Sequence, residues 1–329
     1  MLHIALLGFG VVGSGTAEVI LQNQKQVAAY CGDEVNVKYI LDLRDFPEHP
    51  LGDRVVHDIQ VILDDPEVVL VAEMMGGAHP AYDFTRAALE AGKHVLCEKP
   101  MASNANQARK MVEAAKRNGV TLMEAMKSTL SPAFRSVQEN LHRIGTPRRY
   151  FASFCQYSSR YDKYKEGIVL NAFRPELSNG ALMDIGVYTI YPLVVLFGRP
   201  QAIEAQGIIL SSGADGQGAV NLKYEGMNAT ILYSKIANSM LPSEIEGENG
   251  NIVIDRIQTP TEVLFYPRQA PASGHEVRST GETLHIADHH NEYYHEIKDG
   301  DDFALRNIPS GPPKQPEKWG ELRPVADIM

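Results

Sequence analysis

The sequence predicts an α/β protein in which a doubly wound parallel sheet is followed by an α+β domain with a large, mostly antiparallel open sheet. Short apolar runs alternate with helical patterns over the first ~125 residues, which is typical of a parallel sheet. A glycine-rich turn joins the first apolar run to the first helical pattern. Beyond residue 200, alternating runs follow one another across glycine-rich turns. We expect domains at residues 1–125 and 126–298, and a loosely held tail at 299–329.

The composition is that of an ordinary soluble globular protein, with 44% hydrophobic and 22% charged residues. A net charge of −10 argues against a nucleic-acid groove, which is normally basic. Cys31, Cys97 and Cys155 are widely spaced and match no zinc or thioredoxin spacing, so we expect reduced thiols in the cytoplasm. We expect no signal peptide, because the N-terminal apolar run lacks a basic region and is broken by glycines after six residues. We expect no membrane span, because no apolar run reaches ~18 residues.

The glycine-rich turn predicts a dinucleotide site of the Rossmann type. An apolar run at residues 4–7 leads into a G-x-G-x-x-G pattern, and a helical pattern follows. Glycines let the backbone approach a pyrophosphate, which the free N–H groups of the helix start can then bind. A plain tight turn is the alternative. The predicted cofactor-binding residues of this turn are Gly8, Phe9, Gly10, Val11, Val12 and Gly13.

The end of the second predicted strand, residues 35–41, bears on the choice of cofactor. Asp42 and Arg44 lie just beyond it. An acid at this point binds the ribose 2′-hydroxyl of NAD, whereas an arginine accepts the 2′-phosphate of NADP. Both residue types are present, so NAD and NADP both remain open, and at least one of the two side chains is expected to be a solvated loop charge.

Further strands are predicted at residues 68–74, 94–97 and 120–123, and helices at 58–63, 81–91 and 104–118. Ligands of open α/β sheets bind at the carboxyl ends of the strands. Residues that follow two of these strands are therefore expected to contact the cofactor as well. They are Met75, Gly76, Gly77, His79, Glu98, Lys99 and Pro100.

A helical pattern after Gly180 carries candidate catalytic residues. Asp184 and Tyr188 are four positions apart, so we expect them on one face of the helix. A carboxylate and a phenol suit proton transfer if a cation helps the phenol to ionise, and Lys99 is the candidate cation. Each residue also has a plain interpretation: an acid favoured by the helix dipole, a core tyrosine and a surface lysine.

The segment at residues 158–174 is polar, and its Arg160 and Arg174 are candidates for substrate contacts. The alternative is an ordinary solvated excursion. A strand at residues 148–156 and about six later strands predict an open sheet, whose uncovered face suits a homodimer or homotetramer. The six later strands are expected at residues 203–210, 218–224, 229–236, 243–247, 251–257 and 263–266.

No metal site is expected. His289, His290 and His295 lie near Asp288 and Glu292, but closeness in sequence without a closed ligand set favours histidines that face solvent.

From Val95 to about residue 298 the chain resembles the glucose-fructose oxidoreductase/inositol dehydrogenase (Gfo/Idh/MocA) family. The resemblance is carried by Glu98-Lys99-Pro100 and by the stretch from Ile245 to Ile252. Residues 1–93 look instead like the NAD(P)-binding domain of homoserine dehydrogenase. Here the similarity lies in the stretches at residues 8–15, 43–45 and 73–77. The chain therefore reads as a hybrid, with a seam near residues 92–98.

The Gfo/Idh/MocA resemblance implies an NAD(P)-dependent oxidoreductase that acts on a sugar, polyol or cyclic diol. It implies a catalytic set of Lys99, Asp184 and Tyr188, with tyrosine where many relatives have histidine. Tyr188 would take the hydroxyl proton, Lys99 would stabilise the phenolate, and Asp184 would orient the substrate or the lysine. The homoserine-dehydrogenase-like strand end places Arg44 near the 2′ position, which favours NADP. The alternatives are a homoserine dehydrogenase-like enzyme and a non-catalytic dinucleotide-binding regulator.

Overall fold

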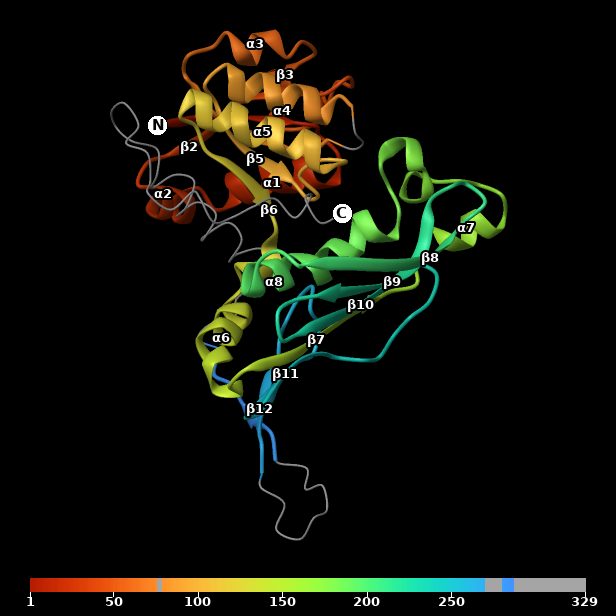
Figure 1. The fold of residues 1–329 in the computed structure, drawn as a ribbon. Helices are drawn as coiled ribbons and strands as arrows, with labels where there is room; N and C mark the ends of the chain where they lie inside the picture. Colours follow the sequence, from red (N-terminus) through yellow and green to blue (C-terminus); the bar gives the residue numbers. More distant parts are fainter. Residues whose placement is uncertain (76–78, 270–279, 287–329) are drawn as a thin grey trace. The chain divides into compact units, whose positions relative to one another are not determined.

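The computed structural model describes residues 1–75, 79–269 and 280–286 (Figure 1). These residues divide between two compact units, one of residues 1–125 and one that begins at Met126. The expected tail at 299–329 and the histidines near residue 290 lie outside the described residues.

The first unit is built on a six-stranded sheet in the order β3-β2-β1-β4-β5-β6. All of its strand pairs are parallel, which confirms the predicted doubly wound sheet. The two-residue β3 is the strand that the sequence pattern misses, because so short a segment has no periodicity. The strands are β1 (Leu2–Leu7), β2 (Val35–Leu41), β3 (Val55–Val56), β4 (Val68–Glu73), β5 (His94–Glu98) and β6 (Leu122–Ala125).

Helices cover this sheet on both faces. Along β1, Ala5 and Leu7 belong to the core beneath α4 and α5, whereas Ile4 and Leu6 belong to the core beneath α1. Successive side chains of a strand point to opposite faces, so a strand between two helical layers is apolar throughout. The helices are α1 (Val11–Gln22), α2 (Gln24–Cys31), α3 (Gln60–Leu63), α4 (Ala81–Glu90) and α5 (Ala105–Asn118), with a 3₁₀ turn η1 (Gly52–Arg54).

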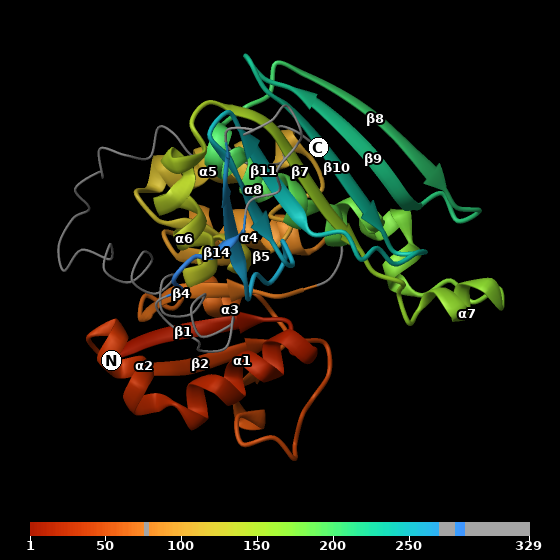
Figure 2. The same ribbon diagram turned by 90° about the horizontal axis from the view of Figure 1, so that it is seen from below.

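The second unit contains an eight-stranded sheet in the order β14-β13-β12-β11-β7-β10-β9-β8 (Figures 1 and 2). It is antiparallel except for the parallel pair of β7 and β10. The predicted strand at residues 148–156 is β7, the six later strands are confirmed, and the short β14 was not predicted. The strands are β7 (Pro147–Cys155), β8 (Ala202–Ile209), β9 (Asp215–Lys223), β10 (Asn228–Ser234), β11 (Ser243–Gly247), β12 (Gly250–Ile254), β13 (Val263–Pro267) and β14 (Glu282–Thr283).

One face of this sheet packs against α8 (Val187–Phe197), whose Val187, Ile190 and Leu193 are buried. The Tyr150 hydroxyl of β7 donates a hydrogen bond to the Thr189 carbonyl oxygen at 3.0 Å, which joins sheet and helix. The other helical elements of this unit are α6 (Pro132–Asn140), α7 (Tyr161–Lys165), and the 3₁₀ turns η2 (Lys127–Thr129), η3 (Leu141–Ile144), η4 (Asn171–Phe173) and η5 (Pro175–Leu177).

A π-helical turn, η6 (Leu182–Gly186), precedes α8 where the sequence predicts regular α-helix. The Leu182 N–H donates to the Asp215 carboxylate at 2.8 Å, and so it is held from outside the helix. At Gly186 a β-carbon would lie 3.2 Å from the Tyr233 ring, so the turn packs directly on the sheet. Single π turns within α-helices are frequent at functional sites.

Among the described residues, the stretch Pro175–Phe197 is the one candidate for a membrane span by length and composition. In this structure it is not one regular helix, because a 3₁₀ turn and a π turn come before α8. Its Asp184 is paired with Lys235, and α8 packs on the sheet. We interpret the stretch as a core segment of the second unit.

Candidate active site

The glycine-rich turn lies between β1 and α1. Gly8 has φ of +90°, a conformation that favours glycine, and its N–H donates to the Leu41 carbonyl oxygen at 2.8 Å. A β-carbon at Gly13 would lie 2.0 Å from the Gly8 carbonyl oxygen, so α1 can approach the turn only with glycine there. At Gly10, by contrast, a β-carbon would meet nothing within 4 Å. Gly8 and Gly13 are therefore needed for the backbone of the turn itself, whereas Gly10 leaves the space above the turn open.

The start of α1 faces open space. Val11 is 92% exposed and Val12 50% exposed, although both are apolar. Within the described residues, no side chain caps the helix at Gly10. The first N–H groups of a helix have no partner inside it, so they are available to an anion. The open surface over Gly10 and these N–H groups fit the pyrophosphate of a dinucleotide.

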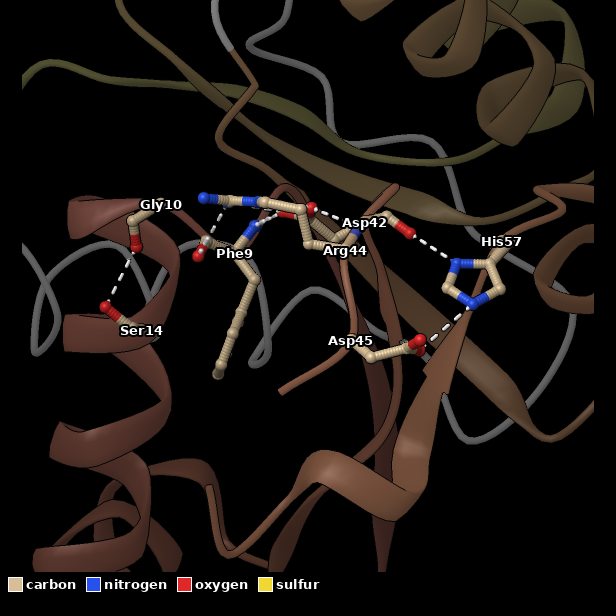
Figure 3. A network of polar contacts seen from close by, with 7 residues as sticks. All are labelled: Phe9, Gly10, Ser14, Asp42, Arg44, Asp45 and His57. Atoms are coloured by element: carbon tan, nitrogen blue, oxygen red, sulfur yellow. Dashed lines mark hydrogen bonds and ion pairs between the residues drawn. The ribbon is translucent and has the colours of Figure 1, made fainter. Parts of the chain in front are cut away.

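Asp42, just beyond the end of β2, is hydrogen-bonded to the glycine-rich turn (Figure 3). Its carboxylate accepts the Phe9 N–H at 2.8 Å and the Arg44 N–H at 3.0 Å. The Arg44 guanidinium donates to both carboxylate oxygens, at 2.9 and 3.0 Å, and also to the Phe9 carbonyl oxygen at 3.3 Å. These donors, the Arg44 side chain above all, lower the pKa of Asp42 to about 2.

Arg44 is far more exposed than its partner, with 62% of its side chain exposed against 10% for Asp42. His57 extends the same network, since its Nδ1 lies 2.7 Å from the Asp42 carbonyl oxygen and its Nε2 lies 3.2 Å from Asp45 (Figure 3). His57 was not predicted, because it belongs to no motif and reaches the network only through the fold. The outward surface beyond β2 therefore carries the Arg44 guanidinium and the His57 imidazole together with the Asp45 carboxylate, whose side chain is 80% exposed.

The loop after β4 contains part of the predicted cofactor set. The Met75 N–H donates to the Glu73 carboxyl at 2.6 Å, and the Met75 side chain packs against Gly8. His79 forms a 2.7 Å contact with Asp83 one turn into α4 and is well exposed. The predicted Gly76 and Gly77 lie outside the described residues.

Two buried carboxyl groups at the strand ends were not predicted. Glu73 at the end of β4 is 3% exposed and Glu124 in β6 is 9% exposed. Burial raises the pKa of each to about 7, and burial also raises the pKa of the Cys97 thiol. Cys97 donates to Glu73 at 3.4 Å, and Glu124 accepts the Met101 N–H at 2.8 Å. Glutamates inside apolar-looking strands are the sequence signal that identifies them.

Glu98 is the last residue of β5, and Lys99 and Pro100 follow it directly. The structure thus has the predicted Glu-Lys-Pro triplet at the carboxyl end of a parallel strand, the edge where ligands of such sheets bind. The Glu124 carboxyl supports the following backbone at Met101.

In the second unit, Asp184 belongs to the π turn. Its carboxylate is 2.5 Å from the Lys235 ammonium group, and Lys235 itself is 3% exposed. The sequence analysis missed Lys235. The available signal was its place in an alternating run, since Ala229, Ile231 and Tyr233 are buried and Lys235 continues their parity. A lysine at such an inward position needs a partner.

Tyr188 lies in the first turn of α8, and its ring packs edge-on against Phe154 of β7 with centroids 5.8 Å apart. The four-residue spacing of Asp184 and Tyr188 therefore crosses a junction between a π turn and an α-helix. The expectation that the two side chains lie on one face stays a prediction.

The two predicted substrate arginines flank α7 and the turn η4. Arg160 is exposed just before α7, and the Arg174 guanidinium pairs with Glu176 at 2.6 Å. Between them Tyr161, Tyr164 and Phe173 form an aromatic cluster with centroid separations of 5.4 to 5.7 Å. The segment is thus partly ordered around a small core of its own. Among the described residues, no group of three or more His, Cys, Asp or Glu side chains is placed to hold a metal.

Two family profiles match this chain. The "Oxidoreductase family, NAD-binding Rossmann fold" matches residues 2–126, and the "GFO/IDH/MocA C-terminal domain" matches residues 138–253. The expected likeness of residues 1–93 to homoserine dehydrogenase is not supported, because the oxidoreductase family profile covers that range. The glycine turn and the strand ends that suggested it are shared features of Rossmann domains.

Individual relatives agree with this assignment. The chain is 60% identical over 172 residues to scyllo-inositol 2-dehydrogenase (NADP(+)) IolU of Bacillus subtilis, covering 52% of each chain. Thus the chain spans about half the length of this relative. It is 30% identical over 255 residues to trans-1,2-dihydrobenzene-1,2-diol dehydrogenase of Danio rerio, covering 73% of this chain and 70% of the relative.

Levoglucosan dehydrogenase, solved with NADH and levoglucosan, has the same fold, with a TM-score of 0.76 over 92% of this chain and 89% of that one at 20% identity. Three findings agree: the parallel sheet with its glycine-rich turn, the open second sheet, and the matches to both family profiles. The chain belongs to the Gfo/Idh/MocA family of oxidoreductases and carries that family's NAD-binding Rossmann domain.

Proposed function

We propose that this protein is an NAD(P)-dependent oxidoreductase that interconverts a hydroxyl and a carbonyl carbon of a sugar, polyol or cyclic diol. The observation that carries the proposal is the nucleotide-binding cradle, by which we mean the backbone at Gly10 and the first N–H groups of α1. Among the residues that the structure describes, the space over Gly10 is open and no side chain caps the start of the helix. In this proposal residues 1–125 form the cofactor domain and 126–298 the substrate and oligomerisation domain.

The class of substrate is inferred from relatives. Inositol, dihydrobenzenediol and levoglucosan appear in the names of the three similar proteins, and each carries hydroxyl groups on a ring. The polar segment around α7 offers donors of the kind that bind hydroxyl groups, and Arg160 and Arg174 are the proposed substrate contacts. In that role Arg174 would exchange Glu176 for the substrate.

The proposed chemistry needs one proton acceptor on the protein. A nicotinamide, when bound, takes the hydride and its two electrons from the carbinol carbon. Tyr188 accepts the hydroxyl proton as the carbonyl double bond forms. A free phenol, with a pKa near ~10, gives up its proton too reluctantly for this at neutral pH, so a cation is needed to favour the phenolate. Lys99 supplies that charge, and Asp184 orients the substrate hydroxyl.

We infer a preference for NADP. The Asp42 carboxylate already accepts N–H groups of Phe9 and Arg44, so it is poorly placed to accept a ribose 2′-hydroxyl. The exposed guanidinium of Arg44 is suited to a 2′-phosphate. The cofactor named for the Bacillus subtilis relative is also NADP(+).

We further propose a homodimer or homotetramer formed through the open sheet. The face opposite α8 carries half-buried apolar side chains on two pairs of neighbouring strands: Phe151 and Leu232 on β7 and β10, and Val253 and Leu264 on β12 and β13. The strand β11 between these pairs contributes Glu244. An uncovered face of this kind suits a second copy of the chain. Light scattering at several concentrations measures the state. The three free cysteines and the acidic net charge are consistent with a cytoplasmic enzyme without nucleic-acid partners.

The decisive experiment is a substrate screen. The purified protein is incubated with NAD or NADP and with inositols, aldoses, cyclic diols or homoserine, and the absorbance of the reduced nicotinamide is followed. We expect turnover with a ring polyol, sugar or diol and none with homoserine. Binding of nucleotide without turnover on any compound would instead favour a dinucleotide-binding regulator.

A further inference from the structure

Lys235 is a buried cation whose side chain is fully engaged. It follows β10, and its ammonium group lies 2.5 Å from an Asp184 carboxylate oxygen and 3.4 Å from the Ala172 carbonyl oxygen. The same ammonium lies 5.2 Å from the centre of the Phe173 ring. A lysine is almost never buried without such partners, because removing its charge from water is costly.

The backbone of Lys235 is engaged as well. Its N–H donates to the Gly216 carbonyl oxygen at 2.8 Å, and its carbonyl oxygen accepts the Ser158 N–H at 2.9 Å. Ser158 opens the polar segment around α7, and Ala172 lies near the end of that segment. Lys235 therefore holds both ends of one excursion of the chain, the first through its carbonyl oxygen and the second through its ammonium group.

Between these ends the segment has a further attachment at Tyr164 of α7, whose hydroxyl forms a 2.6 Å hydrogen bond with the Ser211 hydroxyl and accepts the Ser212 N–H at 2.9 Å. Glu166 to Leu170 are all exposed. Its anchor is Phe173, which is fully buried and touches both Tyr161 and Tyr164 of α7. Because the Lys235 ammonium group lies over the Phe173 ring, α7 is linked through Phe173 to the same group that holds Asp184.

We propose that Lys235 is a positioning residue. It orients the Asp184 carboxylate and holds the segment at residues 158–173 next to Asp184. The inference rests on the proposed dehydrogenase function, in which Asp184 orients the substrate hydroxyl. Its physical basis is the partly buried ion pair. Asp184 lies in the π turn, and its carboxylate is held 2.5 Å from the ammonium group of Lys235, whose side chain is 4% exposed. Lys235 makes no contact with the reacting atoms in this proposal.

The primary variant is Lys235→Met, which keeps the length and apolar stem of the side chain and removes its charge. We expect kcat with the polyol to fall by about 10²-fold, the loss that follows when a catalytic group is misplaced by about an ångström. The dissociation constant of the nucleotide should be unchanged, because the nucleotide-binding cradle belongs to the first unit. Lys235→Arg, which keeps the charge, should recover a substantial part of kcat.

A second measurement does not depend on activity. Lys163 and Lys165 in α7 are more than half exposed and are trypsin sites. If Lys235 fixes the segment, limited trypsin cleavage after these residues, followed by mass spectrometry, should be several-fold faster in Lys235→Met than in the unchanged protein. Lys223→Met, which alters an exposed lysine of β9, is the matched control and should change neither kcat nor cleavage.

The outcomes separate this inference from the proposed function. Turnover by the unchanged protein together with unchanged kcat and unchanged cleavage in Lys235→Met would overturn the positioning role. No turnover by the unchanged protein would overturn the proposed function, and the cleavage rates would then decide whether Lys235 holds the segment. If Lys235→Met does not fold, Lys235→Gln retains a donor without charge. Wild-type kcat and cleavage in that variant would likewise contradict the proposal.

Discussion

At the residue scale, Gly10 and Gly13 differ in the space around them, because a β-carbon at Gly13 would lie 2.0 Å from the Gly8 carbonyl oxygen. A β-carbon at Gly10 would meet no atom within 4 Å, and the residue has φ of −80°, which any amino acid adopts. Gly10→Val should therefore leave the melting temperature nearly unchanged while it abolishes NAD(P)H binding, because the side chain would fill the space of the pyrophosphate. Calorimetric titration with the nucleotide measures this.

Gly15→Ala is the control for Gly10→Val. Gly15 lies one turn further along α1, and its β-carbon would also meet nothing within 4 Å. This variant should bind nucleotide normally and should gain a few tenths of a kcal/mol in stability, since alanine favours helix. If Gly10→Val binds the nucleotide as tightly as Gly15→Ala does, the backbone at Gly10 is not part of the nucleotide site.

Arg44 gives the second prediction at this scale. Arg44→Ala should weaken NADP(H) binding by about 1–3 kcal/mol and leave NAD(H) nearly unaffected, because only NADP carries the 2′-phosphate. The ratio of the two dissociation constants is the quantity to measure. Arg117→Ala, at the exposed end of α5, is the control. A parallel loss for both nucleotides would mean that Arg44 acts by holding Asp42 and Phe9 rather than by binding phosphate.

Tyr188 and Lys99 are the proposed proton acceptor and its cation. Tyr188→Phe should lower kcat by about 10²–10⁴-fold with unchanged nucleotide affinity, the range typical of general acid–base catalysis. Lys99→Met should also lower kcat, and the double variant should lose less than the product of the two factors, because both residues act on one proton. Tyr191→Phe on the same helix is the control. A lower melting temperature with full activity per folded molecule would assign Tyr188 a packing role.

At the element scale, the π turn depends on a residue from another strand. The Asp215 carboxylate accepts the Leu182 N–H as a capping residue does, although it is 33 positions away. Asp215→Ala should therefore cost about 1 kcal/mol of unfolding free energy, and it should lower kcat because the turn carries Asp184. Asp215→Asn keeps an acceptor oxygen and should cost less. Urea denaturation of the two variants tests this, and equal stability would show that the cap is dispensable.

At the scale of the whole molecule, two sets of carboxyl groups make stability respond oppositely to pH. Asp42 has a pKa lowered to about 2, so its contribution is present above its unfolded value of about 4 and is lost as pH falls toward 2. Glu73 and Glu124 have pKa values raised to about 7, so their contribution is present below about 4.5 and is lost as pH rises through 7.

The nucleotide-free protein should consequently be most stable at mildly acidic pH and should lose stability between about pH 5 and 8. Glu124→Gln should flatten this decline, because the amide does not ionise when buried. Unfolding free energies from urea titrations across this range provide the measurement. A decline of the same steepness in Glu124→Gln would exclude Glu124 as its source.

The sequence by itself determined the parts of this protein that are encoded locally. The turn from Gly8 to Gly13 is recognisable because backbone conformation at a glycine depends on few neighbours. The strand β4 and the helix α5 follow from apolar periodicity, because a repeat of two or of about 3.6 residues fixes which face is buried. Glu98 and Lys99 could be placed at a strand end for the same reason.

Only the tertiary structure decided the contacts between residues distant in the chain. Asp184 and Lys235 are 51 positions apart and meet because β10 ends beside the π turn, which depends on the order of strands in the sheet. Asp42 and Phe9 meet because β1 and β2 are parallel neighbours. Periodicity specifies that a side chain points inward but not which strand it will face, and so the partner of a buried charge is fixed only when the sheet is assembled.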